Sequence, residues 1–355
     1  MRERSGFRFR PPPGELSPEL RAVVGLALAP APPDSEALDP DTLWELAGRL
    51  ELREAMAGRL SGWPEGGGHG ALRERLRSWR RLCVARDLLH EEAARQVAAA
   101  AADHGLPVIW LKGFALRQAG IHPSGRRAHR DLDLLTSREG APLLDRLLGE
   151  RGWRRHGRES NEQHLPPLES PEGCYLDIHF RLRGVRLGSR GWARAREVLE
   201  QPGTRAAEGV PGSSLPGHDL LAAHVLVHAV AQHGHRPASY GLLRAVDDLA
   251  ALLPTGEAWR RFAAGPYRWI ARSVSRRELD ALATLTSALA RGELPDPAEQ
   301  PDADRLLRHA QAGATDPRYA RSLRGRHRGE RIREALAEGH LGAYLRRKLA
   351  GLRLG

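Results

Sequence analysis

The chain has 355 residues, which is enough for one large domain or two modest ones, each with its own core. Its 41% of hydrophobic residues is typical of a globular protein, and its two cysteines exclude a disulfide framework and a structural zinc site. We expect a cytoplasmic protein, because the basic N-terminus lacks the apolar stretch of a secretory signal and no apolar run approaches the ~20 residues that cross a bilayer.

The net charge of +11 is confined to the two ends of the chain. Residues 1–10 hold four arginines and one glutamate, a net charge of +3, and residues 318–355 hold ten arginines, one lysine and three glutamates, a net charge of +8. Residues 11–317 are therefore neutral, which argues against a long nucleic-acid channel in the body of the protein. Two interpretations of the basic tail stay open: a solvated helix, or a segment that binds RNA, acidic lipid or an acidic partner.

Helices are predicted over the first hundred residues. Residues 17–29 indicate a short helix with Ser17 as its N-cap, and residues 39–62 indicate a second helix. Residues 71–104 are the longest periodic segment, because apolar residues recur there at three- and four-residue steps. The predicted packing face of that segment consists of Leu72, Leu76, Trp79, Cys83, Leu89, Ala93, Val97 and Ala100.

The middle of the chain mixes strands and helices. Apolar runs at residues 107–111 and 131–135 predict buried strands, and residues 174–182 alternate between apolar and polar side chains, which predicts a third strand. Residues 138–153 predict a helix with a glycine stop. Beyond residues 201–219, which are rich in glycine, proline and serine, every pattern is helical.

These elements predict an α+β fold with a small mixed sheet that is flanked by helical regions at both ends. The predicted organisation is an N-terminal helical region (1–104), a mixed core (105–200), a linker (201–219), a C-terminal helical region (220–317) and a basic tail (318–355).

Two aspartates interrupt the apolar run of residues 131–135. In a strand, Asp131 and Asp133 project from one face with Cα atoms about 6.5–7 Å apart, while Leu132 and Leu134 fill the other face. Carboxylates this close repel each other and lose hydration unless a cation lies between them. Their oxygen atoms suit Mg²⁺ or Mn²⁺. A solvated pair at a strand edge is the alternative interpretation.

A third acid, Asp177, lies on the polar face of the strand at residues 174–182. If this strand neighbours the one with Asp131 and Asp133, three carboxylates converge, which is the ligand set of a two-metal site for displacement at phosphorus. The alternative for Asp177 is a salt bridge to Arg181 or Arg183 on the same face.

Lys112 and Gly113 follow the strand at residues 107–111. A glycine there allows a phosphate to approach the backbone, and the lysine would neutralise a phosphate charge. An ordinary turn between strand and helix is the alternative interpretation.

The motifs in order resemble a known family. A strand, "LKG", a short helix, "R…DLDLL", a helix, "LDIHFRL" and helical "HAVAQHG…LRAVDDLAALL" are similar to the uncharacterised nucleotidyltransferase family within the DNA polymerase beta-like nucleotidyltransferase superfamily. The resemblance runs from about Leu46 to Leu253 and includes His228 and Asp247.

The resemblance implies a role for each motif residue. Gly113 matches the phosphate-loop glycine, Asp131 and Asp133 match the metal-binding pair, and Asp177 matches the third acid. Arg127 matches a basic position that meets the phosphates. One departure concerns the residue after the loop glycine, which is Phe114 where many superfamily members have glycine or serine, so that triphosphate binding must rest on backbone N–H groups, Lys112 and arginines.

The implied reaction moves a nucleotidyl group from an NTP, with Mg²⁺ or Mn²⁺, to a hydroxyl of a small molecule, peptide, protein or tRNA. The alternatives are a catalytically silent binding module of the same fold and an RNA-directed toxin of a toxin–antitoxin pair. The sequence identifies neither the base of the NTP nor the acceptor.

Several histidines also accompany the acids. His179 lies on the same strand face as Asp177 and either orients the substrate or an acid, or is structural. His224 and His228, four apart on a predicted helix with His233 and His235 beyond, have a spacing that can hold zinc, but packed or hydrogen-bonded histidines fit the core-like surroundings better.

Overall fold

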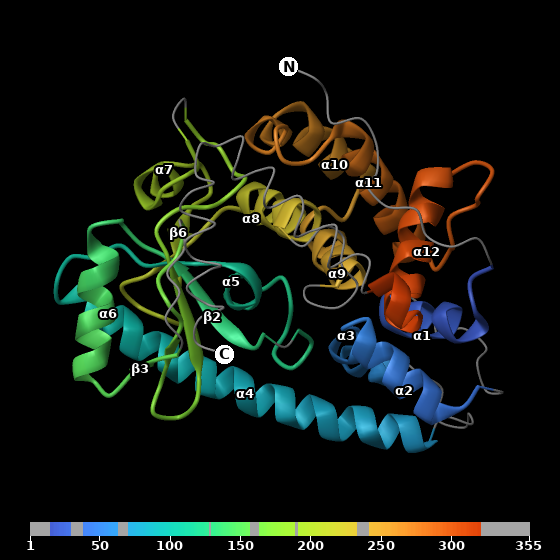
Figure 1. The fold of residues 1–355 in the computed structure, drawn as a ribbon, viewed down its shortest axis with the longest axis horizontal. Helices are drawn as coiled ribbons and strands as arrows, with labels where there is room; N and C mark the ends of the chain where they lie inside the picture. Colours follow the sequence, from blue (N-terminus) through green and yellow to red (C-terminus); the bar gives the residue numbers. More distant parts are fainter. Residues whose placement is uncertain are drawn as a thin grey trace.

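The computed structural model describes residues 15–29, 38–62, 70–127, 129–156, 163–188, 191–232 and 241–320. Across these ranges the chain forms one mixed sheet with helices around it (Figure 1). The N-terminal and C-terminal helices lie next to each other on one side of the sheet (Figure 1). The predicted α+β fold, a mixed sheet between helical regions from both ends of the chain, is therefore confirmed.

The N-terminal region is helical, as predicted, but its second helix is broken. Its elements are α1 (Pro18–Leu28), α2 (Pro40–Arg49), α3 (Arg53–Gly58), the 3-10 turn η1 (Leu60–Gly62) and α4 (Gly70–Ala102). Ser17 caps α1 by accepting a hydrogen bond from the Leu20 N–H at 3.2 Å. The prediction of one helix over residues 39–62 was wrong, because Glu51 adopts a φ of 58° and the chain turns there so that both Leu50 and Leu52 are buried.

The turn at Glu51 also ties the N-terminal helices to a distant part of the chain. The Glu51 carboxylate accepts hydrogen bonds from the Gly241 N–H at 3.0 Å and from the Arg244 guanidinium at 3.3 Å. Arg244 lies on α9 (Leu242–Leu252). One carboxylate thus links two helical regions that are almost 200 residues apart in sequence.

Helix α4 runs along one edge of the molecule, from beneath the sheet to α2 and α3 (Figure 1). Its predicted packing face is only partly right. Leu72, Leu76, Cys83 and Ala93 are buried, whereas Leu89 is 49% exposed. The buried positions of that helical turn are taken instead by two polar residues of the same helix, Asp87 and His90.

Within the described ranges the sheet has seven strands in the order β3-β4-β5-β2-β1-β7-β6. The strands are β1 (Ile109–Trp110), β2 (Asp131–Leu135), β3 (Arg154–Arg155), β4 (Leu168–Glu169), β5 (Tyr175–His179), β6 (Arg205–Ala206) and β7 (Ser214–Leu215). β2 is parallel to β5 and antiparallel to β1. The three strands predicted in the core are therefore neighbours at its centre.

Apolar side chains fix which way the central strands face. Leu132 and Leu134 on β2, and Leu176 and Ile178 on β5, are fully buried on one side of the sheet. Because side chains alternate along a strand, the aspartates of both strands must project from the opposite side.

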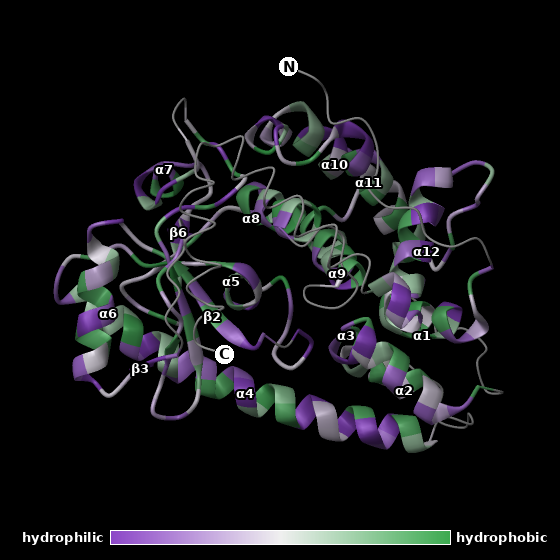
Figure 2. Ribbon diagram, in the orientation of Figure 1, coloured by the Kyte–Doolittle hydropathy of each residue, from purple (hydrophilic) through white to green (hydrophobic). Residues whose placement is uncertain are grey.

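The remaining helices surround this sheet. They are α5 (Lys112–Gln118), α6 (Gly140–Glu150), α7 (Ala195–Leu199), α8 (His218–Leu226), the π-helical turn η2 (Val227–Gln232), α9, α10 (Gly256–Ala264), the 3-10 turn η3 (Pro266–Trp269), α11 (Arg276–Ala290) and α12 (Pro301–Thr315). The segment predicted as a linker, residues 201–219, carries β6 and β7 at one edge of the sheet. Of the basic tail, residues 321–355 lie outside the described residues. Hydrophobic and hydrophilic residues are interleaved along the helices (Figure 2), and among the described helices none has both the length and the apolar character to span a membrane.

Candidate active site

The parallel pairing of β2 with β5 brings the predicted acids together. Asp133 lies directly opposite Asp177, and Asp131 lies opposite Tyr175. The strands at residues 131–135 and 174–182 are therefore neighbours, which was the condition for three carboxylates to converge on one face of the sheet.

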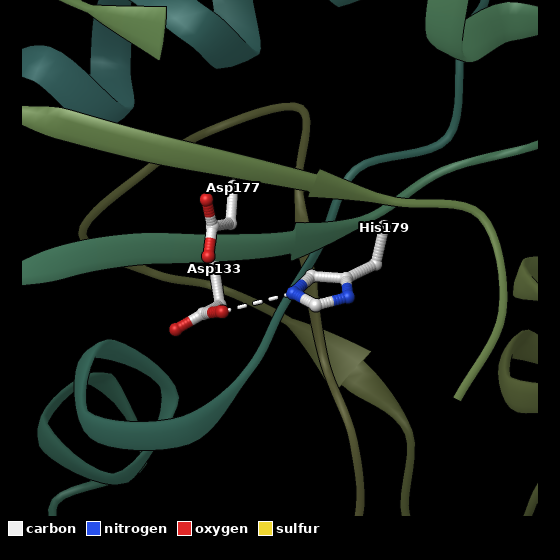
Figure 3. Close-up of side chains that lie close together, drawn as sticks. All are labelled: Asp133, Asp177 and His179. Atoms are coloured by element: carbon white, nitrogen blue, oxygen red, sulfur yellow. Dashed lines mark hydrogen bonds and ion pairs between the residues drawn. The ribbon is translucent and has the colours of Figure 1, made fainter. Parts of the chain in front are cut away.

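The tightest group at this face consists of Asp133, Asp177 and His179 (Figure 3). One ligand atom from each of these residues lies within 4.8 Å of the other two. The His179 imidazole is hydrogen-bonded through Nε2 to Asp133 Oδ1 at 2.9 Å, and Figure 3 shows the imidazole directed toward the Asp133 carboxylate. His179 thus lies beside the acids, as the alternation of β5 predicted. Asp131 lies two residues before Asp133 on β2.

Lys112 reaches the same group from the other side of β2. It begins α5 directly after β1, with a φ of 48°, and its ammonium nitrogen lies 2.6 Å from Asp133 Oδ1. The backbone of β1 is held there because the Leu111 N–H donates to the Asp133 carbonyl oxygen at 2.9 Å. The sequence predicted Lys112 at a phosphate and did not predict this contact with Asp133.

The three carboxyl groups have different electrostatic surroundings. Burial acts to raise the pKa of Asp133, but the Lys112 charge and the hydrogen bond from His179 outweigh it and hold that pKa well below its usual range. Burial, followed by the negative charge of Asp133, raises the pKa of Asp177 to about 6. The charge of Asp133 and then burial raise the pKa of Asp131. The site therefore holds more negative charge than its single lysine balances.

Burial acts to lower the pKa of Lys112, and the charges of Asp133, Asp131 and Asp177 outweigh it, so that the pKa is raised and the ammonium stays charged. In effect, Lys112 supplies the positive charge that such a cluster of acids needs.

Gly113 allows a close approach of two side chains from the loop before β2. A Cβ atom at this position would lie 2.2 Å from Arg127 Nη1 and 2.8 Å from the Cβ of His129. Such contacts are too short for any larger residue without displacement of its neighbours. The glycine is therefore required at least for packing against Arg127.

Arg127 is buried and is held by a partner from α9. Its Nε lies 2.6 Å from Asp248 Oδ1 and its Nη2 lies 2.8 Å from Asp248 Oδ2, which is a bidentate pair. His122 also contacts Asp248 Oδ1, at 2.9 Å. The neighbouring Asp247, which the sequence analysis noted, pairs with Arg126 at 2.8 Å. Arg127 therefore packs against Gly113 and is held there by its ion pair with Asp248 of α9.

The other histidines near the site come from α8, from η2 and from the segment before β4. Burial, followed by the charge of Lys112, lowers the pKa of His224 to about 3, and the His224 and His228 rings lie 6.2 Å apart in an edge contact. No sequence pattern pointed to His164. This residue forms an isolated β-bridge with His179, and the centroids of the two rings lie 5.2 Å apart. His233 and His235 lie outside the described residues. Among the described residues, the only group that brings metal-ligand atoms together is the one with Asp133, Asp177 and His179.

Comparisons with known proteins identify the family of this chain. A family model described as an uncharacterised nucleotidyltransferase matches residues 36–269. Among solved structures, the solution structure of the antibiotic-resistance factor ANT(2'')-Ia is similar at 19% sequence identity, over 52% of this chain and 96% of that chain, with a TM-score of 0.37. A search of curated proteins gave no match. Because the family model spans more than half of the chain, the chain belongs to the uncharacterised nucleotidyltransferase family and is a nucleotidyltransferase.

Proposed function

We propose that this protein transfers a nucleotidyl group from an NTP to a hydroxyl group of its acceptor at the site formed by Asp131, Asp133 and Asp177. The observation that carries this proposal is the register of β2 and β5, which sets Asp133 opposite Asp177 with Lys112 against them. A catalytically silent module would have no need to keep three acids on one face of a sheet, where they repel one another.

The residues present fit a divalent cation. Carboxylate oxygens from Asp133 and Asp177 and an imidazole nitrogen from His179 lie within 4.8 Å of each other, and Asp131 is on the same strand face. The raised pKa of Asp177 indicates that its charge is poorly compensated without such a cation. Oxygen ligands favour Mg²⁺, and the nitrogen ligand is also suited to Mn²⁺. A cation bound here supplies neutralisation of the phosphate charge and polarisation of the phosphate oxygens.

The chain's own residues have separate roles in this proposal. The N–H groups at the start of α5 and the Lys112 ammonium bind the phosphates, and Gly113 lets Arg127 and His129 pack against this turn. Arg127, whose charge is paired with Asp248, supports this turn by packing against Gly113. Asp177, which lies opposite Asp133 on β5, accepts the proton of the attacking hydroxyl group.

The acceptors that fit this reaction are a small molecule, a peptide, a protein or tRNA. The silent module and the RNA-directed toxin remain the competing functions, and a cytoplasmic location remains part of the proposal. The positive charge of the basic tail supports the toxin alternative, but residues 321–355 of that tail lie outside the described residues.

Label transfer from each of the four α-labelled NTPs into fractions of a cell lysate tests the proposal. With Mg²⁺ present, we expect the wild-type protein to label one class of molecule and Asp133→Asn to label none. Asp280→Asn, which changes an exposed acid on α11, is the matched control and should behave as the wild type. A folded Asp133→Asn variant that labels at the wild-type rate would overturn the assignment, and the labelled fraction identifies the acceptor class.

A further inference from the structure

Helix α4 exposes an apolar patch beside the candidate active site. Leu82, Leu88 and Leu89 are 49%, 61% and 49% exposed, and Ala85, which is also exposed, lies between them on the helix. Soluble proteins seldom expose several large apolar side chains together unless the surface binds something. The patch lies on the long helix at the lower edge of Figure 1.

A pocket of about 520 Å³ opens on one flank of this patch. Leu82, Ala85 and Leu89 form one wall, and Arg130 and Tyr175 lie on another. Arg130 precedes Asp131 in the chain, and Tyr175 is the register partner of Asp131 on β5. The pocket is therefore next to Asp131, and its volume is in the range of ligand-binding pockets, which leaves ample room for an amino-acid side chain.

A second hollow, of about 680 Å³, opens on the other flank of α4. Leu88 and Ala85 line it, and Ala85 is shared with the first pocket. Four arginines of α4 surround it: Arg73, Arg77, Arg80 and Arg81. A ligand that fills both hollows would cross α4 over Ala85.

The charges around the second hollow call for an acidic ligand, since four arginines and no acid line it. Among the described residues, Arg77 and Arg81 approach a carboxylate only in Glu74, at 3.5 and 3.6 Å. Neither Arg80 nor Arg86 forms an ion pair within the described ranges of the chain. The protein's own C-terminal tail has the wrong sign of charge to cover these arginines, since residues 318–355 carry a net charge of +8.

The combination of arginines and exposed leucines distinguishes between two kinds of acidic partner. The phosphates of a nucleic acid would pair with the arginines but leave the leucines uncovered. A polypeptide with acidic and leucine-like side chains satisfies both groups. The surface therefore favours a polypeptide.

We infer that the acceptor of the proposed reaction is a polypeptide, which docks across α4 and places a hydroxyl side chain in the pocket beside Asp131. The inference rests on the proposed function. The serine, threonine or tyrosine oxygen attacks the α-phosphorus, its proton passes to Asp177, the bond from the α-phosphorus to the bridging oxygen breaks, and pyrophosphate leaves. The product is a phosphodiester between the side chain and the nucleoside.

The experiment uses random twelve-residue peptides displayed on phage, selected on the full-length protein, with the enriched peptides then synthesised. We expect these peptides to contain aspartate or glutamate together with leucine-like residues. Their Kd, measured by fluorescence anisotropy, should rise at least tenfold for Leu88→Asp and for Arg80→Glu. Leu199→Asp, which changes an exposed leucine on α7, is the matched control and should bind as the wild type does.

Enriched peptides with a hydroxyl side chain should also become labelled from an α-labelled NTP, with a kcat/KM at least tenfold lower in Leu88→Asp. The inference is overturned if no peptide is enriched, if the variants bind peptides as the wild type does, or if the substitutions instead abolish binding of an RNA twelve-mer or self-association. Absence of all NTP turnover in the wild type would reject the proposed function, whereas the peptide affinities would still decide the docking surface.

Discussion

The Lys112 ammonium nitrogen lies 2.6 Å from Asp133 Oδ1, inside the group of acids that we propose as a metal site. A lysine and a divalent cation cannot both neutralise the same carboxylate oxygen at full strength. We therefore expect the lysine to compete with the cation in the nucleotide-free protein, and to move to a phosphate when both cation and NTP are bound.

Replacement of this lysine should strengthen metal binding. In Lys112→Met we expect the Mn²⁺ affinity of the nucleotide-free protein at pH 8 to rise about tenfold, because removal of a charge at this distance is worth about 1–4 kcal/mol. Nucleotidyl transfer should fall. Lys112→Arg, which keeps the charge, is the control, and calorimetric titration is the measurement. Equal or weaker Mn²⁺ binding in Lys112→Met would show that the lysine does not compete with the cation.

Removal of the Asp177 carboxylate, opposite Asp133, should weaken Mn²⁺ binding. Asp177→Asn is expected to lower Mn²⁺ affinity at least tenfold, about 1.4 kcal/mol, because a charged oxygen ligand becomes a neutral one. The paramagnetic resonance signal of free Mn²⁺ measures this directly. Asp103→Asn, at an exposed ion pair with Arg151, should leave the affinity as it is. Unchanged affinity in Asp177→Asn would remove that residue from the ligand set.

The contact between Gly113 and Arg127 predicts that two glycine-to-alanine substitutions change the free energy of unfolding in opposite directions. Gly113→Ala should lower the free energy of unfolding by about 1–3 kcal/mol, because the new methyl group overlaps Arg127 and His129. Gly149→Ala on α6, where a Cβ meets nothing within 4 Å, should raise it by about 0.5–1 kcal/mol. Urea denaturation of the two variants gives both values. A stabilised Gly113→Ala would mean that the loop has more room than the structure gives it.

The buried Arg127–Asp248 pair predicts a pH dependence. Burial acts to raise the pKa of Asp248, but the Arg127 charge and hydrogen bonds from His122 and Arg127 hold it below its usual value of 3.8. Such a carboxylate stabilises the fold fully above pH 3.8 and loses this contribution as the pH falls below that value. Asp248→Asn, which leaves the arginine buried without a counter-charge, should cost about 3–5 kcal/mol at pH 7.

Unfolding experiments at pH 7 and pH 3 test this. The difference in unfolding free energy between wild type and Asp248→Asn should be smaller at pH 3. The same difference at both pH values would show that the ionised carboxylate contributes nothing beyond its shape.

The strands of the site could be predicted because their information is local. Alternation in "CYLDIHFRL" and the leucines around Asp131 and Asp133 set the direction of each side chain before any tertiary contact is known. The pairing of the two strands is not local information, and the structure supplies it. By contrast, the contact of Lys112 with Asp133 depends on β1 lying antiparallel to β2, and nothing local in the sequence fixes that order.

Long-range partners were beyond sequence reasoning for the same physical reason. Arg127 and Asp248 are 121 residues apart, and "VDD" on a helix gives no sign of which acid pairs with which arginine. On α4 the apolar period predicted Leu89 as buried, but the helix buries Asp87 and His90 instead. A periodicity identifies a helix more reliably than it identifies the residues that its neighbours will cover.

The hydrogen bonds of Glu51 also bear on where the protein can be cut. This carboxylate holds α9 through Gly241 and Arg244, and both Glu51 and Arg244 line the pocket beside Asp131. A fragment that starts at residue 105 would contain every acid of the site, yet it would lack α4 and the anchor of α9. We therefore expect the smallest working piece of this chain to begin before the first strand, among the N-terminal helices.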